Sequence, residues 1–288
     1  MSTDFEADFQ FYFFQVFLTV FCGGKMKSPE NFFCGIDIGS RTGKITIIDN
    51  EKNIVFSEII KTVASATKTY TALTEMIPEN FRKKISASAV TGYGRESTAS
   101  MCGFSATEIT CHYLGVLRLH PETKTIIDIG GQDSKVITID NNSRIKDFAM
   151  NDRCAAGTGR FLEVMMERIG FSIEDFAELD VSEVEPVKIN STCTVFAESE
   201  VISMVSRDIP QIVIASSLAR MVAANTFFMA RKTRPEAPFF MSGGVSKLKP
   251  VRFHLEKFFG SSVKTDEFSQ FMGALGAALF AMKETETK

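Results

Sequence analysis

Two stretches of eight residues follow one pattern in this chain: Asp37-Ile38-Gly39-Ser40-Arg41-Thr42-Gly43-Lys44 at 37–44 and Asp128-Ile129-Gly130-Gly131-Gln132-Asp133-Ser134-Lys135 at 128–135. Each copy combines an aspartate, a glycine turn and a lysine, and each lies among short apolar runs that predict strands. The predicted strands are 32–38, 45–48 and 54–60 around the first copy, and 125–129, 136–139 and 145–150 around the second. A hairpin repeated about 90 positions apart predicts two related domains that face one nucleotide.

The chemistry of the two turns favours phosphate. Backbone N–H groups of a glycine turn, with the hydroxyls of Ser40 and Thr42, are suited to hold phosphate oxygens. Lys44 supplies a positive charge, and Asp37 is suited to hold a magnesium-bound water. The catalytic candidates are Asp37, Asp128, Gln132 and Asp133, and the nucleotide-binding candidates in these turns are Gly39, Ser40, Arg41, Thr42, Gly43, Lys44, Gly130 and Gly131.

A third glycine turn, at 242–247, follows a predicted strand at 238–241 and opens a helix. Its backbone is flat enough to support an adenine, so Gly243, Gly244 and Gln270 complete the predicted nucleotide contacts. The other predicted elements are a strand at 86–90, helices at 69–76, 107–119, 173–179 and 209–228, a short strand at 187–189, and a closely packing helix of small residues at 271–278. Within its predicted helix, His112 is interpreted as a satisfied structural histidine.

Two cysteines lie in small polar loops that precede helical patterns. Cys154 is followed by Ala-Ala-Gly-Thr-Gly, after which apolar residues at helical spacing begin at Phe161. Cys193 is followed by a capping segment and another helical pattern. A lone cysteine is most often a small buried apolar residue. The N-terminus of a helix, however, favours the thiolate, and two such loops make both cysteines candidates for chemistry.

The composition is that of a globular protein with a large core. The 288 residues carry a net charge of -3, with 44% hydrophobic and 23% charged residues. No basic stripe indicates a nucleic-acid partner, and six scattered cysteines without a CxxC pair favour a reducing cytoplasm over a disulfide framework.

The N-terminal run at 11–22 is apolar but follows acidic residues, so it does not fit a signal peptide. It is also too short to span a membrane, and no other segment is expected to span one. We interpret residues 1–30 as an extension outside the fold, with Met26 as a candidate initiator. An interfacial membrane anchor is the alternative.

The order of the turns resembles the superfamily of actin, sugar kinases and heat-shock chaperones. Within it, the cysteine loops at 151–161 and 191–201 resemble the activator component of 2-hydroxyacyl-CoA dehydratases, a group that includes the ATPase subunits of benzoyl-CoA reductases. Thr91-Gly92-Tyr93-Gly94-Arg95, Glu108-Ile109-Thr110-Cys111-His112 and the second hairpin are similar to the same family. The resemblance extends over residues 33 to 282.

This resemblance implies an α/β fold of two ribonuclease-H-like, actin-type ATPase domains with a nucleotide cleft between them. The first domain is expected at 31–118, with the C-terminal helix at 264–288 packing back on it. The second is expected at 119–263 and carries the two loop cysteines. Lys247 departs from the family pattern, which has a neutral residue there, and this affects the expected adenosine contacts.

The activity implied by the resemblance is that of an ATP-dependent one-electron reductase. In such activators a homodimer holds one 4Fe-4S cluster, and ATP hydrolysis with Mg²⁺ changes the helix geometry around it. An electron then passes to a two-subunit iron–sulfur (R)-2-hydroxyacyl-CoA dehydratase, and ferredoxin or flavodoxin is the expected donor. Cys154 and Cys193 would be the cluster ligands, and Cys22, Cys34, Cys102 and Cys111 are interpreted as structural.

Three alternatives to this activity stay open at this stage. The chain could serve another low-potential iron–sulfur reductase, such as benzoyl-CoA reductase. It could instead be a sugar-kinase-like phosphotransferase, with Asp133 or Asp152 as the base for a hydroxyl substrate. A non-catalytic nucleotide-dependent regulator is the third possibility. Iron content separates the activator from the last two, because neither needs Cys154 and Cys193 in such loops.

Overall fold

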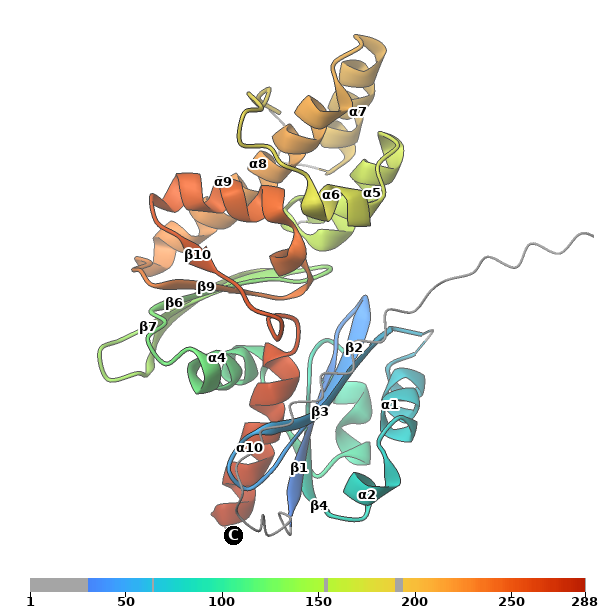
Figure 1. Ribbon diagram of the computed structural model, residues 1–288, viewed down its shortest axis with the longest axis vertical. Coiled ribbons are helices and arrows are strands. Elements are labelled where there is room, and N and C mark those ends of the chain that lie inside the picture. The colour runs from blue at the N-terminus through green and yellow to red at the C-terminus, as the bar shows by residue number, and fades with distance from the viewer. Residues whose placement is uncertain (1–30, 64, 153–154, 190–193, 288) are drawn as a thin grey trace, which may run out of the picture.

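The computed structural model describes residues 31–63, 65–152, 155–189 and 194–287. Within these ranges the chain is a mixed α/β protein with two five-stranded sheets. In Figure 1 the first sheet lies below the second, and helices α5 to α9 lie above the second sheet. The predicted extension at 1–30 lies outside the described residues.

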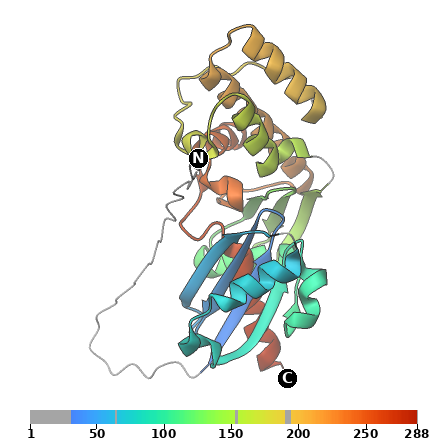
Figure 2. The ribbon, with the colours of Figure 1, turned by 90° about the vertical axis from the view of Figure 1, so that its right-hand side faces the viewer.

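The first sheet has the strand order β3-β2-β1-β4-β5. β1, β2 and β3 form an antiparallel meander, β4 pairs parallel with β1, and β5 pairs parallel with β4. The strands are β1 Phe32–Ile38, β2 Thr42–Ile48, β3 Ile54–Lys61, β4 Ile85–Thr91 and β5 Phe104–Ser105. The helices in this part are α1 Ala66–Glu75, α2 Glu79–Arg82, α3 Arg95–Thr98, η1 Ala99–Met101 and α4 Glu108–Leu119, and Figure 2 shows α1 on the outer face of the sheet.

The second sheet has the order β10-β9-β6-β7-β8 and repeats the meander in β6, β7 and β8. The strands are β6 Thr125–Ile129, β7 Ser134–Ile139, β8 Ile145–Asn151, β9 Phe239–Ser242 and β10 Val263–Lys264. The helices that follow β8 are η2 Ala155–Gly157, α5 Gly159–Arg168, α6 Ile173–Glu178, α7 Thr194–Ser206, α8 Gln211–Ala230, η3 Arg231–Thr233, η4 Gly244–Lys247, α9 Lys249–Phe259 and α10 Met272–Glu286.

Side-chain alternation along β1 explains how the sheet packs. All seven β1 residues are buried, as expected for a central strand with both faces covered. Residues 32, 34, 36 and 38 join a core cluster with Tyr70 and Leu73 of α1. Phe33 instead packs with α4 and α10, in a cluster that also contains Ile126 of β6. Because strand side chains alternate, Asp37 lies on the same face as Phe33, and Asp128 on the same face as Ile126.

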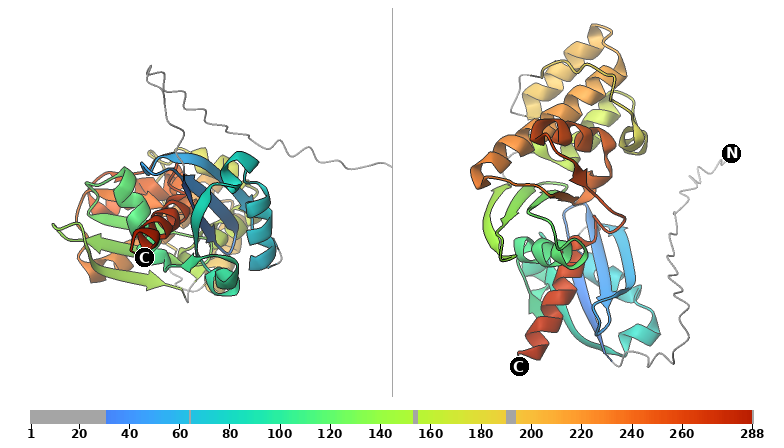
Figure 3. Two further views of the ribbon diagram at one scale, coloured as in Figure 1. Left: turned by 90° about the horizontal axis from the view of Figure 1, so that it is seen from below. Right: turned by 60° about the vertical axis from the view of Figure 1, so that its left-hand side comes forward.

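Helices α4 and α10 therefore form a layer between the two sheets, and the left view of Figure 3 shows α10 in this position. The small residues of α10 allow close contact with α4, as the sequence predicts. A Cβ atom on Gly276 would lie only 1.7 Å from the carbonyl oxygen of Cys111. The same helix packs along β1 and β4 of the first sheet. The domain limits at 118 and 263 stay predictions.

The predicted strand at 187–189 is wrong, because these residues form no strand in the structure. The backbone N–H of Val187 instead donates to the hydroxyl of Ser217 on α8, 2.9 Å away. A side chain therefore takes the hydrogen bond that a neighbouring strand would accept. Among the described residues, the segment Gln211–Thr233 is long and apolar enough to cross a membrane by length and composition. More than half of its most apolar window, 56%, is buried inside the protein, where α8 packs in the largest core cluster.

Candidate nucleotide site

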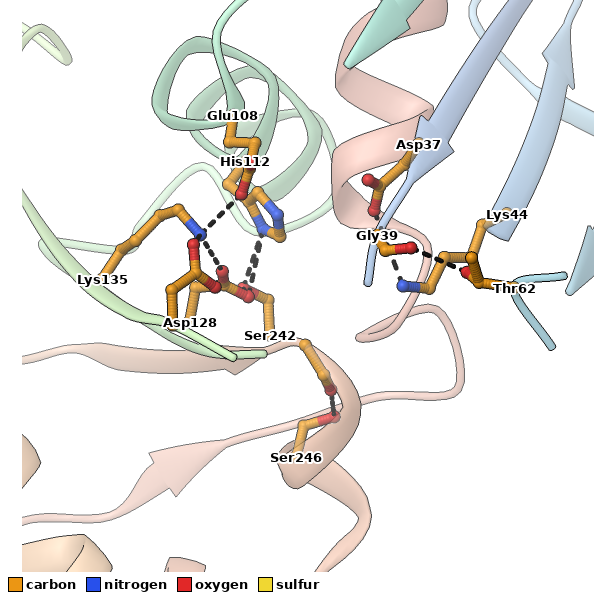
Figure 4. Close-up of polar contacts among 12 residues, drawn as sticks. Asp37, Gly39, Lys44, Thr62, Glu108, His112, Asp128, Lys135, Ser242 and Ser246 are labelled. Carbon is orange, nitrogen blue, oxygen red and sulfur yellow. Dashed lines mark hydrogen bonds and ion pairs between the residues drawn. The ribbon is translucent and has the colours of Figure 1, made fainter. Parts of the chain in front are cut away.

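A cavity of about 460 Å³ lies between the two sheets, where the turns of both hairpins meet. This volume falls in the range of about 300–1,000 Å³ that is typical of small-molecule sites. Residues of both hairpins line it, together with residues of α4, α5 and the η4 region. Figure 4 shows Asp37 and Lys44 on one side, and Glu108, His112, Asp128 and Lys135 on the other.

The structure brings nearly all of the predicted site residues to this cavity. The predicted residues that line it are Asp37, Gly39, Ser40, Arg41, Thr42, Lys44, Asp128, Gly130, Gly131, Gln132, Asp133, Gly243, Gly244 and Gln270. Gly43 does not line it, because β2 already begins at Thr42 and Gly43 faces Thr69 and Leu73 of α1. Cys154 and Cys193 lie outside the described residues.

The two hairpins place an aspartate opposite a lysine in the same register. Asp37 pairs with Lys44 across β1 and β2, and Asp128 pairs with Lys135 across β6 and β7. The Nζ of Lys44 lies 3.7 Å from Asp37 Oδ2, and that of Lys135 lies 3.4 Å from Asp128 Oδ2. The repeat seen in the sequence is therefore a repeat of geometry, with one Asp–Lys pair contributed by each sheet.

Lys135 is also the centre of a buried charge cluster, and only 2% of its side chain is exposed. Its Nζ lies 2.6 Å from Glu108 Oε2 and 2.6 Å from Asp133 Oδ2. Burial alone would lower the pKa of Lys135, but Asp128, Glu108 and Asp133 raise it, so the ammonium stays protonated. Burial raises the pKa of Glu108, although Lys135 opposes this effect.

Asp128 is fixed from two sides and stays ionised. Burial alone would raise its pKa, but His112 and Lys135 outweigh burial and lower it. Ser242 Oγ donates to Asp128 Oδ1 over 3.0 Å. Gly243, which follows Ser242, has a φ of 83°, and a Cβ there would lie 2.7 Å from Asp128 Oδ1, so only glycine fits this close approach.

The sequence prediction omitted several residues of this site. Glu108, His112 and Lys135 line the cavity, although only their motifs were noted in the sequence. The repeat itself contains the signal for Lys135, since it occupies the position of Lys44 in the second copy. Glu108 and His112 lie four positions apart on α4, and helix periodicity places both on the cavity side only once α4 is known to lie between the sheets.

The second hairpin is hydrogen-bonded directly to α5, the helix that follows Cys154 in the sequence. The backbone N–H of Gly159 donates to the carbonyl of Gly130 over 2.9 Å, and that of Arg160 donates to Gly131 over 3.0 Å. In addition, Ser134 Oγ donates to the carbonyl of Gly157 over 2.7 Å. The second turn and the first turn of α5 are therefore in direct contact.

The donors around the cavity fit a magnesium ion that is carried by a nucleotide. Among the described residues, no group of three or more His, Cys, Asp or Glu side chains is arranged to hold a metal ion. Magnesium usually keeps several waters and binds through one or two carboxylates plus substrate phosphates. Lys135 faces three carboxylates, so the second-hairpin side of the cavity keeps an excess of negative charge that a divalent cation would offset.

Two of the described cysteines, Cys34 and Cys111, are poor metal ligands, because burial favours the neutral thiol. Burial raises the pKa of Cys111 to about 12 and also raises that of Cys34. Cys102 is partly buried and donates from Sγ to Ser88 Oγ over 3.1 Å. The structural roles expected for these cysteines stay predictions.

Two homologous sheets, each offering an Asp–Lys hairpin to one shared cavity, define an actin-type nucleotide-binding ATPase. The chain belongs to the BadF/BadG/BcrA/BcrD ATPase family, whose model matches residues 34–281. The resemblance stated from the cysteine loops and hairpins is therefore confirmed at the level of the family.

Proteins of known identity support the same assignment. The chain is 39% identical over 252 residues to the (R)-2-hydroxyglutaryl-CoA dehydratase activating ATPase of Acidaminococcus fermentans, which covers 87% of this chain and 96% of that protein. The crystal structure of component A of the A. fermentans dehydratase matches with a TM-score of 0.81 at 37% identity, over 89% of this chain and 99% of that chain.

Two further structures separate the family from the wider fold. The activator of 2-hydroxyisocaproyl-CoA dehydratase from Clostridium difficile, with bound ADPNP, matches with a TM-score of 0.80 at 36% identity, over 89% of this chain and 96% of that chain. A ROK family glucokinase from Streptomyces griseus matches with a TM-score of 0.59 at 16% identity, over 88% of this chain and 100% of that chain. At this identity the match to the glucokinase shows the fold alone. Together with the activator structures, it confirms the predicted two-domain actin-type fold.

Proposed function

We propose that this protein is the ATP-driven activator of a 2-hydroxyacyl-CoA dehydratase. A homodimer holds one 4Fe-4S cluster through Cys154 and Cys193 of each chain and passes a low-potential electron to the dehydratase. The observation that carries the proposal is the hydrogen bonding between the second hairpin turn and the start of α5, because it connects the nucleotide cavity to the segment after Cys154.

ATP binds in the cavity with its phosphates between the two hairpin turns. Gly39, Ser40, Thr42 and Lys44 contact the phosphates from the first hairpin, and Gly130, Gly131 and Gln132 contact them from the second. When bound, Mg²⁺ offsets the charge of the phosphates and of the carboxylates that face them. Asp128 and Asp37 would hold the metal ion through water, and Gln132 and Asp133 would orient the water that attacks the γ-phosphate. Gly243, Gly244 and Gln270 line the adenosine end.

Cys154 and Cys193 fit a cluster that two chains share. A 4Fe-4S cluster takes four thiolates, and one chain offers two cysteines in polar loops, so a two-fold axis completes the set. The described flanks support this arrangement, because η2 begins directly after Cys154, α7 begins directly after Cys193, and the two elements are in contact. Phe196 of α7 is 70% exposed, which is consistent with an apolar contact surface next to Cys193.

Hydrolysis is coupled to the cluster through α5 and α7. A change at the γ-phosphate moves the second turn, and the bonds to Gly159 and Arg160 pass this movement to α5. Arg168 of α5 then connects to Glu198 of α7, with its Nε 3.2 Å from Oε1. In the sequence α7 begins directly after Cys193 and α5 begins five residues after Cys154, so the positive ends of these helices would ease the addition of an electron to the cluster.

The test is the activation of a dehydratase under anaerobic conditions. Purified activator, a two-subunit 2-hydroxyacyl-CoA dehydratase, reduced ferredoxin or flavodoxin and Mg-ATP are mixed, and the enoyl-CoA product is measured. Product is expected with ATP and not with a non-hydrolysable analogue. Cys193→Ala should retain ATP binding and lose activation, whereas Cys102→Ala should retain both.

The same assay separates the alternatives. A chain that hydrolyses ATP and reduces benzoyl-CoA reductase but no dehydratase would serve the other reductase class. ATP-dependent phosphorylation of a sugar, by a protein without iron, would favour a kinase and contradict the proposal. We place the activator in the cytoplasm, since Cys34, Cys102 and Cys111 are free thiols and the cluster requires reducing conditions.

A further inference from the structure

His112 lies on α4, between the two sheets, and is only 5% exposed. Its Nδ1 lies 3.0 Å from Ser242 Oγ and 3.5 Å from Asp128 Oδ1. Figure 4 shows the ring between Glu108 and Ser242, on the Asp128 side of the cavity. The residue is therefore part of the cavity wall and is not a histidine satisfied within its own helix.

The hydrogen bonds fix the proton on one ring nitrogen. A serine hydroxyl has one proton, and Ser242 donates it to Asp128 Oδ1. The contact between Ser242 and His112 therefore requires His112 Nδ1 to be the donor. The result is a directed relay in which Nδ1–H of His112 donates to Ser242 Oγ, and Ser242 Oγ–H donates to Asp128.

The opposite edge of the ring approaches the first hairpin. A Cβ atom built on Gly273 of α10 would lie 3.2 Å from His112 Nε2 and 2.9 Å from Asp37 Oδ2. His112 Nε2 and Asp37 Oδ2 therefore both lie close to Gly273, which has no side chain. The imidazole therefore reaches from the relay on Asp128 to the immediate neighbourhood of Asp37.

The relay also restrains Asp128 more fully than Asp37 is restrained. Ser242 holds Oδ1 of Asp128 while Lys135 approaches Oδ2 at 3.4 Å. At the matching position of the first sheet, Thr91 is paired with Asp37 as Ser242 is paired with Asp128. Of the two matching residues, Thr91 and Ser242, His112 is hydrogen-bonded to Ser242. The aspartate of the second hairpin is therefore oriented by a histidine through a serine.

We propose that His112 is a positioning residue for ATP hydrolysis, which orients Asp128 through Ser242 and fixes its relation to Asp37. The proposal rests on the placement of the nucleotide between the hairpins that is proposed above. Without His112, Ser242 loses the donor that orients its hydroxyl, so the bond from Ser242 to Oδ1 of Asp128 is no longer fixed in direction. Substrate still binds, because the turns and Lys44, which hold the phosphates, are unchanged, whereas the reacting geometry is lost.

The test replaces His112 by asparagine, whose amide nitrogen lies near the position of Nδ1, and by glutamine, whose amide nitrogen lies near the position of Nε2. Steady-state ATP hydrolysis by the full chain should show a fall in kcat of about tenfold or more for His112→Ala, since misplacement of reacting groups slows turnover steeply. KM for ATP should change by less than about threefold. His112→Asn retains a donor near the Nδ1 position and should recover most of kcat, while His112→Gln should not. Ser242→Ala should reproduce the loss, and combining it with His112→Ala should add little.

A matched control is His120, which is paired with Asp266 over 2.6 Å and lies outside the cavity lining. His120→Ala should leave kcat unchanged. Equal rates for His112→Asn and His112→Gln, or a kcat unaffected in a folded His112→Ala protein, would overturn the proposal. Lys44→Met tests the nucleotide placement separately. If it weakens ATP binding while His112→Ala keeps full kcat, the placement stands and the role of His112 falls.

Discussion

Arg41 and Glu163 form an ion pair at the cavity, with Nη2 of Arg41 2.7 Å from Oε2 of Glu163. Arg41 belongs to the turn of the first hairpin, and Glu163 lies on α5, so the pair joins the first sheet to the helix that follows Cys154. The two side chains are 46% and 30% exposed. Such a partly exposed pair contributes only about 0–1 kcal/mol to folding. Because both side chains line the cavity, we expect Arg41 to matter more for ligand binding than for stability.

Arg41→Met is expected to weaken ATP binding by about tenfold, because a guanidinium on the cavity wall is lost near the phosphates. The unfolding free energy should fall by less than about 1 kcal/mol. Arg160→Met is the matched control, since Arg160 Nη1 contacts the same Glu163 carboxylate oxygen over 3.1 Å without lining the cavity. Titration of a fluorescent ATP analogue and urea unfolding measure both effects. Equal loss of affinity in the two variants would assign the effect to Glu163 instead of Arg41.

Lys135→Met is expected to reduce the free energy of unfolding by about 3–5 kcal/mol, because it leaves buried carboxylates without their cation. Glu108→Gln in the same chain should recover part of this loss by removing one of those charges. Lys264→Met is the control, since its partner Glu122 lies 3.0 Å away in an exposed pair. Urea unfolding of the three variants provides the comparison. A Lys135→Met protein as stable as the parent would contradict the described charge cluster.

Gly276→Ala is expected to destabilise the protein by about 1–3 kcal/mol, because its methyl group would meet the Cys111 carbonyl and force α10 away from α4. Gly103→Ala is the control, since a Cβ there would meet only Ser88 O at 3.3 Å. Thermal unfolding should show a clear fall in Tm for the first variant and a small change for the second. Similar Tm values would mean that α4 and α10 pack less closely than described.

His254 is expected to make stability depend on acidity. Burial and the nearby Arg220 lower its pKa to about 4, while Ser216 Oγ lies 3.1 Å from Nε2. Because the folded pKa is below the unfolded value of about 6.5, the stabilising contribution is complete above that pH and is lost as pH falls towards 4. His254→Gln should make the stability curve shallower between these limits by up to about 1.4 kcal/mol per pH unit. Parallel curves for the two proteins would show that His254 titrates normally.

The sequence predicted the hairpins correctly because local signals determine them. Asp37 and Asp128 each end an apolar strand and precede glycine, so pattern and turn chemistry agree. The strand predicted at 45–48 is longer in the structure, where β2 begins at Thr42, because Thr42 and Gly43 have the composition of a turn but pair with β3 in the sheet. Register therefore decides that Lys44 faces Asp37 while Gly43 faces α1, and register is a tertiary property.

The charge cluster around Lys135 and the relay from His112 to Asp128 could not be predicted from the sequence, because they too depend on tertiary packing. Glu108 and His112 face Lys135 and Ser242 only because α4 packs between the sheets, and these partners are far away in the chain. The strand predicted around Val187 is wrong for the same reason. A short apolar run is typical of a strand, but the N–H group of Val187 donates to the side chain of Ser217 and not to a neighbouring strand. Apolar periodicity indicates which residues are buried but does not identify their partners.

In the proposed activator, nucleotide chemistry in this cavity serves a cluster that two chains share. The most direct measurement is iron and acid-labile sulfide per particle, combined with mass by light scattering, on protein purified without oxygen. A dimer with about four irons and four sulfides is expected, lost in Cys154→Ala and in Cys193→Ala but retained in Cys102→Ala. A monomer with four irons, or a dimer whose iron survives both substitutions, would contradict the account.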